Sequence, residues 1–241
     1  MSSIKKLIKS FTPYQIIYLS AVVLLTVAFL IFFPEYMFEE GSAGFFLVFI
    51  TVVDTLANPL CELLIAKQSK WNFVVDFFFI EIPEVLLCLH FGWYAIAASV
   101  VLFWMPVDVV SFIRWSKHPD REDDTLTRVK QLKPWQSLLV VVGIFAFGFI
   151  VGDLLQHIPG ASDTYLDAFA TAVGMTNGIL LLLRYSEQWI AWLITTVLYI
   201  FMDISQEAYI LLVSEFAMLV NTIYGIVKWR IYVRTHQNEK E

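Results

Sequence analysis

Long apolar runs alternate with short polar segments along the whole chain. A helix that crosses the roughly 30 Å hydrocarbon core of a bilayer needs about 20 consecutive apolar residues. The runs are apolar at odd and even positions alike, whereas the strands of a membrane barrel would alternate. The pattern therefore predicts an all-α integral membrane protein with eight transmembrane helices, at 14–34, 43–66, 73–91, 93–115, 136–152, 165–183, 189–205 and 207–229.

Composition excludes the soluble and disordered classes. Of the 241 residues, 59% are hydrophobic and 16% are charged, against roughly 45–50% and about 25% in soluble domains. The two cysteines, Cys61 and Cys88, lie inside apolar runs and do not suggest a disulfide scaffold. The first run ends in Phe-Phe-Pro-Glu-Tyr without a small-residue cleavage site, which favours a retained first helix over a signal peptide.

The distribution of cations predicts the orientation. With a cytoplasmic N-terminus and eight crossings, all 16 lysines and arginines fall in segments on the cytoplasmic side, and the outer segments carry acids instead. Cationic side chains retain their flanking loops on that side of the membrane. We therefore expect a multi-pass protein of the cell (inner) membrane with both termini cytoplasmic, the lipid bilayer as a partner, and no nucleic acid.

The chain also shows an internal repeat. Spans two to four run from Asp54 to Trp115, and spans six to eight run from Asp167 to Trp229; each triplet begins with an aspartate, contains a short basic turn and closes in Arg-Trp or Lys-Trp. The fifth span restores the direction of the chain, so the two triplets are predicted to be parallel, as in several transporters. The predicted regions are 1–42 (cytoplasmic N-terminus and extra first helix), 43–115 (first three-helix bundle), 116–164 (cytoplasmic loop and linker helix), 165–232 (second three-helix bundle) and 233–241 (cytoplasmic tail).

Several spans carry ionisable or amide side chains, which are costly in a membrane and suggest function. The pattern permits two interpretations: an acid-lined route for a cationic substrate, or acids that sit near the interface and pair with Lys67 and Lys70. The polar residues are Asp54, Asn58, Cys61 and Glu62 on one face of span two, Asp76, Glu81 and Glu84 in span three, Asp108 in span four, and Asn177, Glu215 and Asn221 in the second triplet.

Two tryptophans, Trp189 and Trp192, lie three residues apart at the start of span seven. A planar cationic ring gains about 0.5–2 kcal/mol over an indole face, and the amides of Gln188, Asn177 and Asn221 could hold hydroxyl groups. The alternative is an interfacial aromatic belt, where tryptophan is common.

These motifs together resemble a known family. Tyr165-Leu166-Asp167 is followed by Arg184-Tyr185-Ser186-Glu187-Gln188-Trp189 with Trp192 three further on, Tyr224-Gly225 precedes Trp229, and Asn72 follows Trp71. Residues 43–232 in this respect resemble the PnuC family of vitamin transporters, and the first helix resembles the extra one that some members carry.

The resemblance implies a SWEET-like core of seven helices, two parallel three-helix bundles joined by a linker helix. It implies uptake of a vitamin or nucleoside, with nicotinamide riboside foremost and thiamine, riboflavin or a deoxynucleoside as alternatives. Transport would be facilitated diffusion, and a cytosolic kinase that does not bind stably would trap the solute by phosphorylation. No cofactor or metal is implied, and a homo-oligomer is compatible with the sequence. The predicted substrate-binding residues are Trp189, Trp192, Thr196, Gln188, Asn177, Asn221, Tyr224, Asp108 and Asn72.

The chain departs from the family pattern at several polar positions. Thr196 and Asp108 stand where an asparagine is usual, Val101 where a glutamine is usual, and Asp76 where a glycine is usual. Amides are thus partly replaced by carboxylates, which leaves the identity of the substrate open.

Two other function classes remain open. An intramembrane enzyme could use Asp54 and Asp108 as a dyad, although the chain has no HExxH or GxSxG motif and we predict that it is not an enzyme. A substrate-binding subunit of a larger uptake complex is the other alternative, and proton coupling through the carboxylates is also open. Pro59, Pro83 and Pro106 lie inside the helices of the first triplet only, where they could act as hinges.

Overall fold

The computed structural model describes residues 10–34, 42–118 and 129–237, and these residues are helical apart from short connections. Within these ranges no strand is present; the one β-bridge joins Lys130 to Tyr185. The predictions made for the first nine residues, the outer segment 35–41, the loop 119–128 and the last four residues lie outside the described residues. The all-α prediction is confirmed for the part described.

Seven helical segments are long and apolar enough to cross a membrane. They begin within a few residues of seven of the predicted runs, and the last one continues well beyond its predicted end. They are α2 (Pro13–Phe32), α3 (Ser42–Ala66), the combined α6 (Tyr94–Ser99), η2 (Val100–Trp104) and α7 (Met105–Ser116), then α8 (Pro134–Leu155), α9 (Thr164–Leu183), α10 (Gln188–Ser205) and α11 (Leu211–Gln237).

The remaining predicted span, the third at 73–91, is not a continuous helix. It consists of α4 (Asn72–Phe79) and α5 (Glu81–Phe91), which are separated at Ile80, whose φ and ψ are −118° and −61°. Pro83 has no N–H and cannot bond to the carbonyl of Phe79 as an uninterrupted helix requires. Of the eight predicted transmembrane helices, seven are therefore matched by a described helical segment long and apolar enough to cross a membrane.

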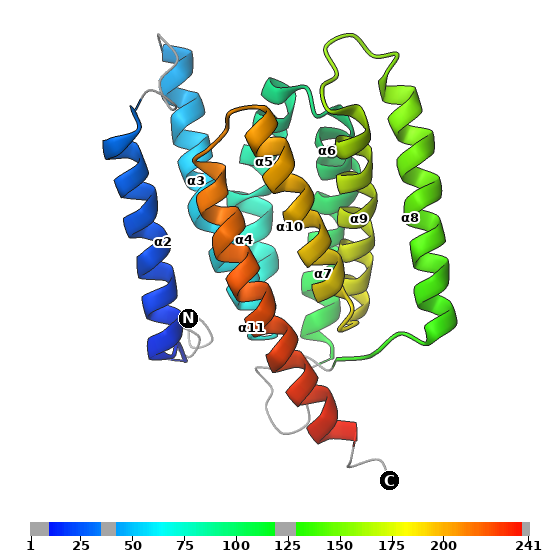
Figure 1. Ribbon diagram of the computed structural model, residues 1–241. Coiled ribbons are helices and arrows are strands. Elements are labelled where there is room, and N and C mark those ends of the chain that lie inside the picture. Colours follow the sequence, from blue (N-terminus) through cyan, green and yellow to red (C-terminus); the bar gives the residue numbers. More distant parts are fainter. Residues whose placement is uncertain (1–9, 35–41, 119–128, 238–241) are drawn as a thin grey trace.

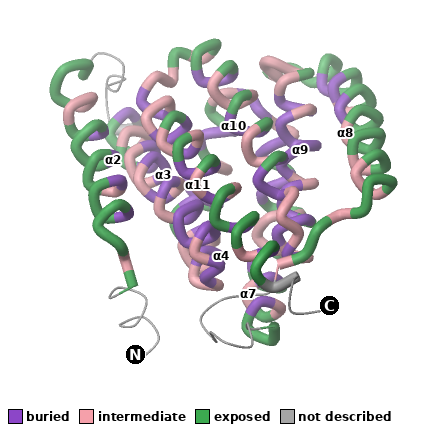
Figure 2. The backbone as a smooth tube through the Cα atoms, turned by 60° about the horizontal axis from the view of Figure 1, so that its bottom comes forward, coloured by how far each residue is buried: buried purple, intermediate pink, exposed green. Residues whose placement is uncertain are grey.

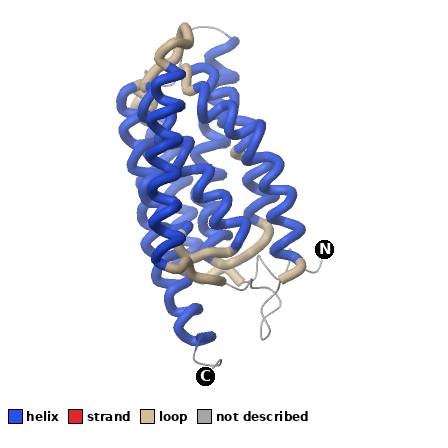
Figure 3. Tube along the Cα trace, turned by 90° about the vertical axis from the view of Figure 1, so that its right-hand side faces the viewer, coloured by secondary structure: helices blue, strands red, loops and turns tan. Residues whose placement is uncertain are grey.

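The helices form one bundle, with α2 at one edge and α8 at the other (Figure 1). The residues of α2 and α8 are largely exposed, whereas α9 is buried along most of its length (Figure 2). Seen from the side, the long helices run roughly parallel to one another (Figure 3). Because the outward faces carry large apolar side chains such as Leu24, Leu138 and Ile223, the bundle has the surface expected of a protein surrounded by lipid.

The first helix is attached by polar contacts. The Tyr18 hydroxyl donates to the Ala217 carbonyl oxygen at 3.0 Å, and Gln15 donates to the Tyr224 hydroxyl at 3.1 Å. At its start, the Lys67 ammonium donates to the Ser10 carbonyl oxygen at 2.8 Å. Partial burial, and then the nearby charge of Lys228, lowers the pKa of Lys67. The extra helix thus packs against α3 and α11.

Two glycines bring α8 close to α9. A Cβ atom at Gly148 would lie 2.5 Å from the Phe169 ring, and one at Gly152 would lie 2.4 Å from the Tyr165 ring. The spacing of four residues places both glycines on one face of α8, the small-residue arrangement that lets membrane helices approach closely.

We expect Gly152→Leu to separate α8 from α9 and to lower the melting temperature of the purified protein by several degrees, because the leucine side chain would overlap the Tyr165 ring. Gly143→Leu, on the same helix with nothing within 4 Å of the added carbon, is the matched control and should melt like the wild type. Equal melting temperatures for all three proteins would contradict this packing.

Two closing tryptophans connect the predicted triplets. Trp115, at the end of the first triplet, donates its indole N–H to the Leu181 carbonyl oxygen at 3.1 Å. Trp229, at the end of the second, donates to the Ile65 carbonyl oxygen at 3.3 Å. Each triplet thus bonds to the other through an equivalent residue, as two similarly built units would do.

Candidate functional site

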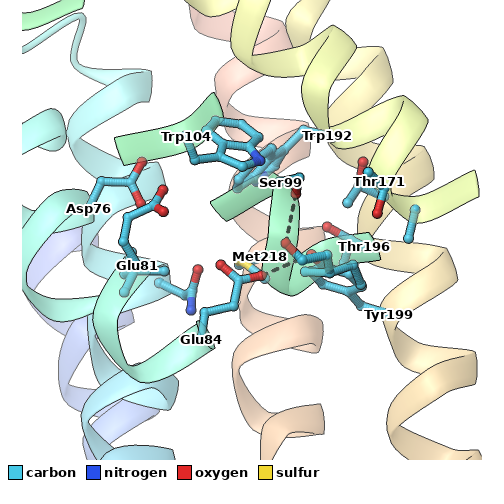
Figure 4. Close-up of a pocket in the computed structure, with 16 residues that line it drawn as sticks. Asp76, Glu81, Glu84, Ser99, Trp104, Thr171, Trp192, Thr196, Tyr199 and Met218 are labelled. Carbon is cyan, nitrogen blue, oxygen red and sulfur yellow. Dashed lines mark hydrogen bonds between the residues drawn. The ribbon is translucent and has the colours of Figure 1, made fainter. Parts of the chain in front are cut away.

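A cavity lies between the two predicted triplets. Its wall is formed by α3, α4, α5, α6, η2, α9, α10 and α11, and it has about 50 Å³ that the centre of a water molecule can reach. One such molecule needs roughly 10–15 Å³ on this measure, so the space holds a few waters. The side chains that line it are polar on one side and aromatic on another (Figure 4).

The acidic side of the cavity comes from the interrupted helix. Asp76 lies in the last turn of α4 and Glu81 is the first residue of α5, so the break at Ile80 places both carboxylates on the cavity wall. Glu84 follows one turn later and accepts a hydrogen bond from the Tyr199 hydroxyl at 3.0 Å (Figure 4). The wall therefore carries three carboxyl groups.

The aromatic side includes Trp104 and Trp192, which lie at the same end of the cavity (Figure 4). Trp104 is the last residue of the π-helical turn η2, two residues before Pro106. A Cβ at Gly178 would lie 3.1 Å from the Trp104 ring, so the glycine leaves space for the indole. Single π-turns within helices are frequent at functional sites, because they change the face on which side chains project.

Comparison with known proteins identifies the fold and the family. A sequence profile described as nicotinamide mononucleotide transporter matches residues 48–231. This chain belongs to that family. The membership covers most of the chain and confirms the resemblance to the PnuC transporters; the protein is a multi-pass membrane transporter.

Two named relatives of this transporter family are similar along most of their length. A protein called nicotinamide riboside transporter PnuC from Haemophilus influenzae is 25% identical over 190 residues, 77% of this chain and 80% of the relative. One of the same name from Neisseria mucosa is 25% identical over 196 residues, 78% of this chain and 74% of the relative.

A solved structure has the same fold. The crystal structure of the vitamin B3 transporter PnuC superposes with a TM-score of 0.76 at 22% identity and covers 94% of each chain. At that identity the likeness concerns the arrangement of helices, and its coverage extends beyond the residues that match the family profile.

The structure brings two of the nine predicted substrate-binding residues of this transporter to the cavity. Trp192 and Thr196, one turn apart on α10, both line it. Asp108 does not line it but lies beside its acidic side, where one oxygen each of Asp76, Glu81 and Asp108 are within 4.8 Å of one another. Their substrate-binding role stays a prediction.

Trp189 lies in a cluster of tryptophans away from the cavity wall. Its side chain is 1% exposed, it packs against Gly225, and its ring centroid is 5.7 Å from that of Trp229 at an interplanar angle of 87°. Trp115 adjoins the same cluster, 6.3 Å from Trp229. Its predicted role in stacking a substrate remains untested, and its contacts in this structure are packing contacts.

The other predicted residues do not line the cavity; Tyr224 is half-buried, and the rest are buried. Asn177 lies one turn beyond Gly174, a wall residue of α9, and neither atom of its amide has a hydrogen-bond partner among the described residues. Gln188 and Asn221 are buried at the start of α10 and within α11. Tyr224 contacts the first helix, and the Asn72 amide donates to the Ser69 carbonyl oxygen at 2.7 Å.

The enzyme alternative pairs Asp54 with Asp108. Asp54 accepts a hydrogen bond from Asn58 at 3.1 Å and is not a member of the carboxylate group that contains Asp108. Fourteen of the sixteen wall residues are absent from the predicted site, among them the aromatic residues Trp104 and Tyr199. The signal for Trp104 is its position two residues before a proline inside a span, and Tyr199 follows Trp192 by seven residues on the same helical face.

Asp167, part of the family motif, has a structural role. Its two carboxylate oxygens accept the backbone N–H groups of Ala95 and Ile96 at 2.8 and 2.9 Å. N–H groups in the first turn of a helix have no acceptor within that helix. Asp167, from the second triplet, supplies the acceptor and thus caps α6 of the first triplet.

We expect Asp167→Ala to lower the melting temperature by several degrees. Hydrogen bonds to a charged group contribute roughly 1.5–3 kcal/mol each, and the substitution leaves two buried N–H groups without an acceptor. Asp167→Asn keeps one acceptor oxygen, so its melting temperature should lie between those of the wild type and Asp167→Ala. A wild-type melting curve for Asp167→Ala would show that the cap does not stabilise the fold.

Proposed function

We propose that this transporter carries nicotinamide riboside, or a vitamin or nucleoside with a similar flat cationic ring, across the cell membrane by facilitated diffusion. The observation that supports the substrate class best is the cavity wall, which carries three carboxyl groups opposite an aromatic end. The names of the two relatives point to the same solute.

The chemistry of the wall suits a pyridinium ring. Indole faces attract a cation through the ring quadrupole, by about 2 kcal/mol or more when water is excluded. Carboxylates in a partly buried site attract the same charge, at an effective dielectric constant of about 20 by roughly 4 kcal/mol at 4 Å. Hydroxyl groups at Thr171, Thr195, Thr196 and Ser99 can bond to a ribose. The thiazolium ring of thiamine would use the same groups, so thiamine is the second candidate.

The architecture supports alternating access between two SWEET-like bundles. The cavity is smaller than a vitamin, so the solute can enter only when the surrounding helices or side chains move. Two irregular segments lie beside it, the α4–α5 break at Ile80 and the π-turn before Pro106. Pro59, by contrast, lies inside the continuous helix α3. Hinges at the first two positions would let the first triplet move against the second.

The distribution of charge supports an orientation in the cell. Among the described cations, Lys67 directly follows α3, Lys117 directly follows α7 and Lys133 directly precedes α8. The end of α7 and the start of α8 lie at the lower side of Figure 1. With that side cytoplasmic, the solute would be released into the cytosol of the cell and trapped there by a kinase that phosphorylates it.

Ligand-dependent thermal shift tests the substrate. A ligand that binds only the folded protein raises its melting temperature by mass action. We expect nicotinamide riboside to raise it most among nicotinamide riboside, thiamine, riboflavin and deoxynucleosides. A shift with riboflavin or a deoxynucleoside and none with the cationic solutes would contradict the proposal.

A further inference from the structure

Three carboxyl groups from three helical segments converge beside the cavity. Asp76 of α4, Glu81 of α5 and Asp108 of α7 each place one oxygen within 4.8 Å of the other two, and the side chains are 8%, 2% and 1% exposed. The helix break at Ile80 and the packing of α4 against α7 bring these three side chains together.

Three carboxylate oxygens of this cluster lack a partner among the described residues. Both carboxylate oxygens of Asp108 and one of Glu81 are buried without a hydrogen-bond partner in the described part of the chain. The hydroxyl of Ser111, fully buried and three residues beyond Asp108 on the same face of α7, has none either. Buried carboxylates are normally paired or coordinate a metal ion, since leaving their charge without a partner is unfavourable.

The spacing suits one ion. Two oxygens bound to the same Ca²⁺ at 2.3–2.6 Å are at most about 4.6–5.2 Å apart, and two bound to Mg²⁺ at 2.0–2.1 Å at most about 4.2 Å. The three oxygens all lie within 4.8 Å of one another, as ligands of one ion must, and a site built from protein oxygens favours Ca²⁺ over Mg²⁺, which usually keeps several of its waters. Pro83 also leaves the Phe79 carbonyl without its helical donor, and carbonyls at interrupted membrane helices are common cation ligands.

We propose that Asp76, Glu81 and Asp108 bind a hard metal cation of the size of Ca²⁺ or Na⁺ in the wall of the cavity, with Ser111 as a further oxygen donor. Asp76 and Glu81 also face the cavity, so the bound ion would reduce the negative charge that a cationic solute meets. The site does not depend on which solute is carried.

Isothermal titration calorimetry of the purified full chain tests the site. The protein is first stripped of metal by a chelator, and it is then titrated separately with CaCl₂, NaCl and MgCl₂ at an ionic strength kept constant with choline chloride. We expect saturable binding of one Ca²⁺ or Na⁺ per chain, with Mg²⁺ weaker; the arm that saturates at the lower concentration identifies the ion. Asp108→Asn and Glu81→Gln should each weaken that binding at least about tenfold, since affinity follows the charge of the ligand set.

Glu62→Gln is the matched control, because Glu62 is also a fully buried carboxyl group but lies neither in the cluster nor on the cavity wall; it should bind the ion like the wild type. Melting curves without metal show that each variant is folded. The absence of saturable binding to the wild type, tighter binding of Mg²⁺ than of both other ions, or unchanged binding in Asp108→Asn would overturn the proposal. Because the readout is ion binding, it is independent of whether nicotinamide riboside is the solute.

Discussion

Trp192→Ala is expected to weaken the binding of nicotinamide riboside roughly 30-fold or more. Trp192 lines the cavity, and the loss of a desolvated cation–π contact of about 2 kcal/mol or more corresponds to that factor. The melting temperature without ligand should change little, because the indole borders a cavity and not a filled core. Titration of the purified variant with the solute, together with its melting curve, gives both quantities.

Trp189→Ala is the matched comparison on the same helix. Its indole is fully packed between Gly225 and Trp229, and truncation of a buried tryptophan costs roughly 3–5 kcal/mol of stability. We therefore expect a fall of many degrees in melting temperature, with much less effect on the affinity of the protein that remains folded. Loss of affinity in Trp189→Ala and none in Trp192→Ala would place the solute in the tryptophan cluster instead of the cavity.

Glu84→Gln is expected to weaken the binding of cationic nicotinamide riboside about tenfold or more, and to leave an uncharged analogue such as its reduced form nearly unaffected. Glutamine keeps an oxygen that can accept the Tyr199 hydroxyl, so the substitution removes charge with little change of shape. A neighbouring carboxylate contributes on the order of a few kcal/mol to a cation at an effective dielectric constant of about 20. Titration with the two ligands separates the charge effect from a packing effect.

Tyr199→Phe is the control for that experiment, since it removes the hydrogen bond to Glu84 but keeps the negative charge. It should preserve the preference for the cationic ligand. If Glu84→Gln lowered the affinity for both ligands equally, Glu84 would shape the cavity and would not select for the charge of the solute.

The helices were largely predictable because each apolar run is long enough to span a bilayer and ends in polar residues. The interrupted span was not, because 73–91 reads as one apolar run. Pro83 was the available signal, but proline in a membrane helix can also be accommodated without a break, as Pro59 is in α3. Whether a helix breaks depends on what its neighbours offer the freed carbonyl groups.

The binding residues were only partly predictable, for a geometric reason. Trp189 and Trp192 are three residues apart and close on the helix surface, yet one packs into a slot formed by Gly225 and the other faces the cavity. That difference is set by α11, whose position no local spacing reveals. Trp104 reaches the cavity from a π-turn, which rotates its side chain away from the face that a regular helix would give it.

The close approach of Asp76, Glu81 and Asp108 to one another could not be predicted from the sequence either. All three were recognised as unusual acids within spans, and two of them were recognised as departures from the family pattern. Their mutual approach within 4.8 Å depends on the break at Ile80 and on the packing of α7 against α4.

Counterflow in liposomes that contain only the purified chain is the most direct measurement. Vesicles preloaded with unlabelled nicotinamide riboside should accumulate labelled nicotinamide riboside from outside, without ATP, a kinase or an imposed ion gradient, and Trp192→Ala should accumulate far less. If the chain binds the solute in detergent but the vesicles accumulate no label, it is a binding subunit and not a facilitator of diffusion.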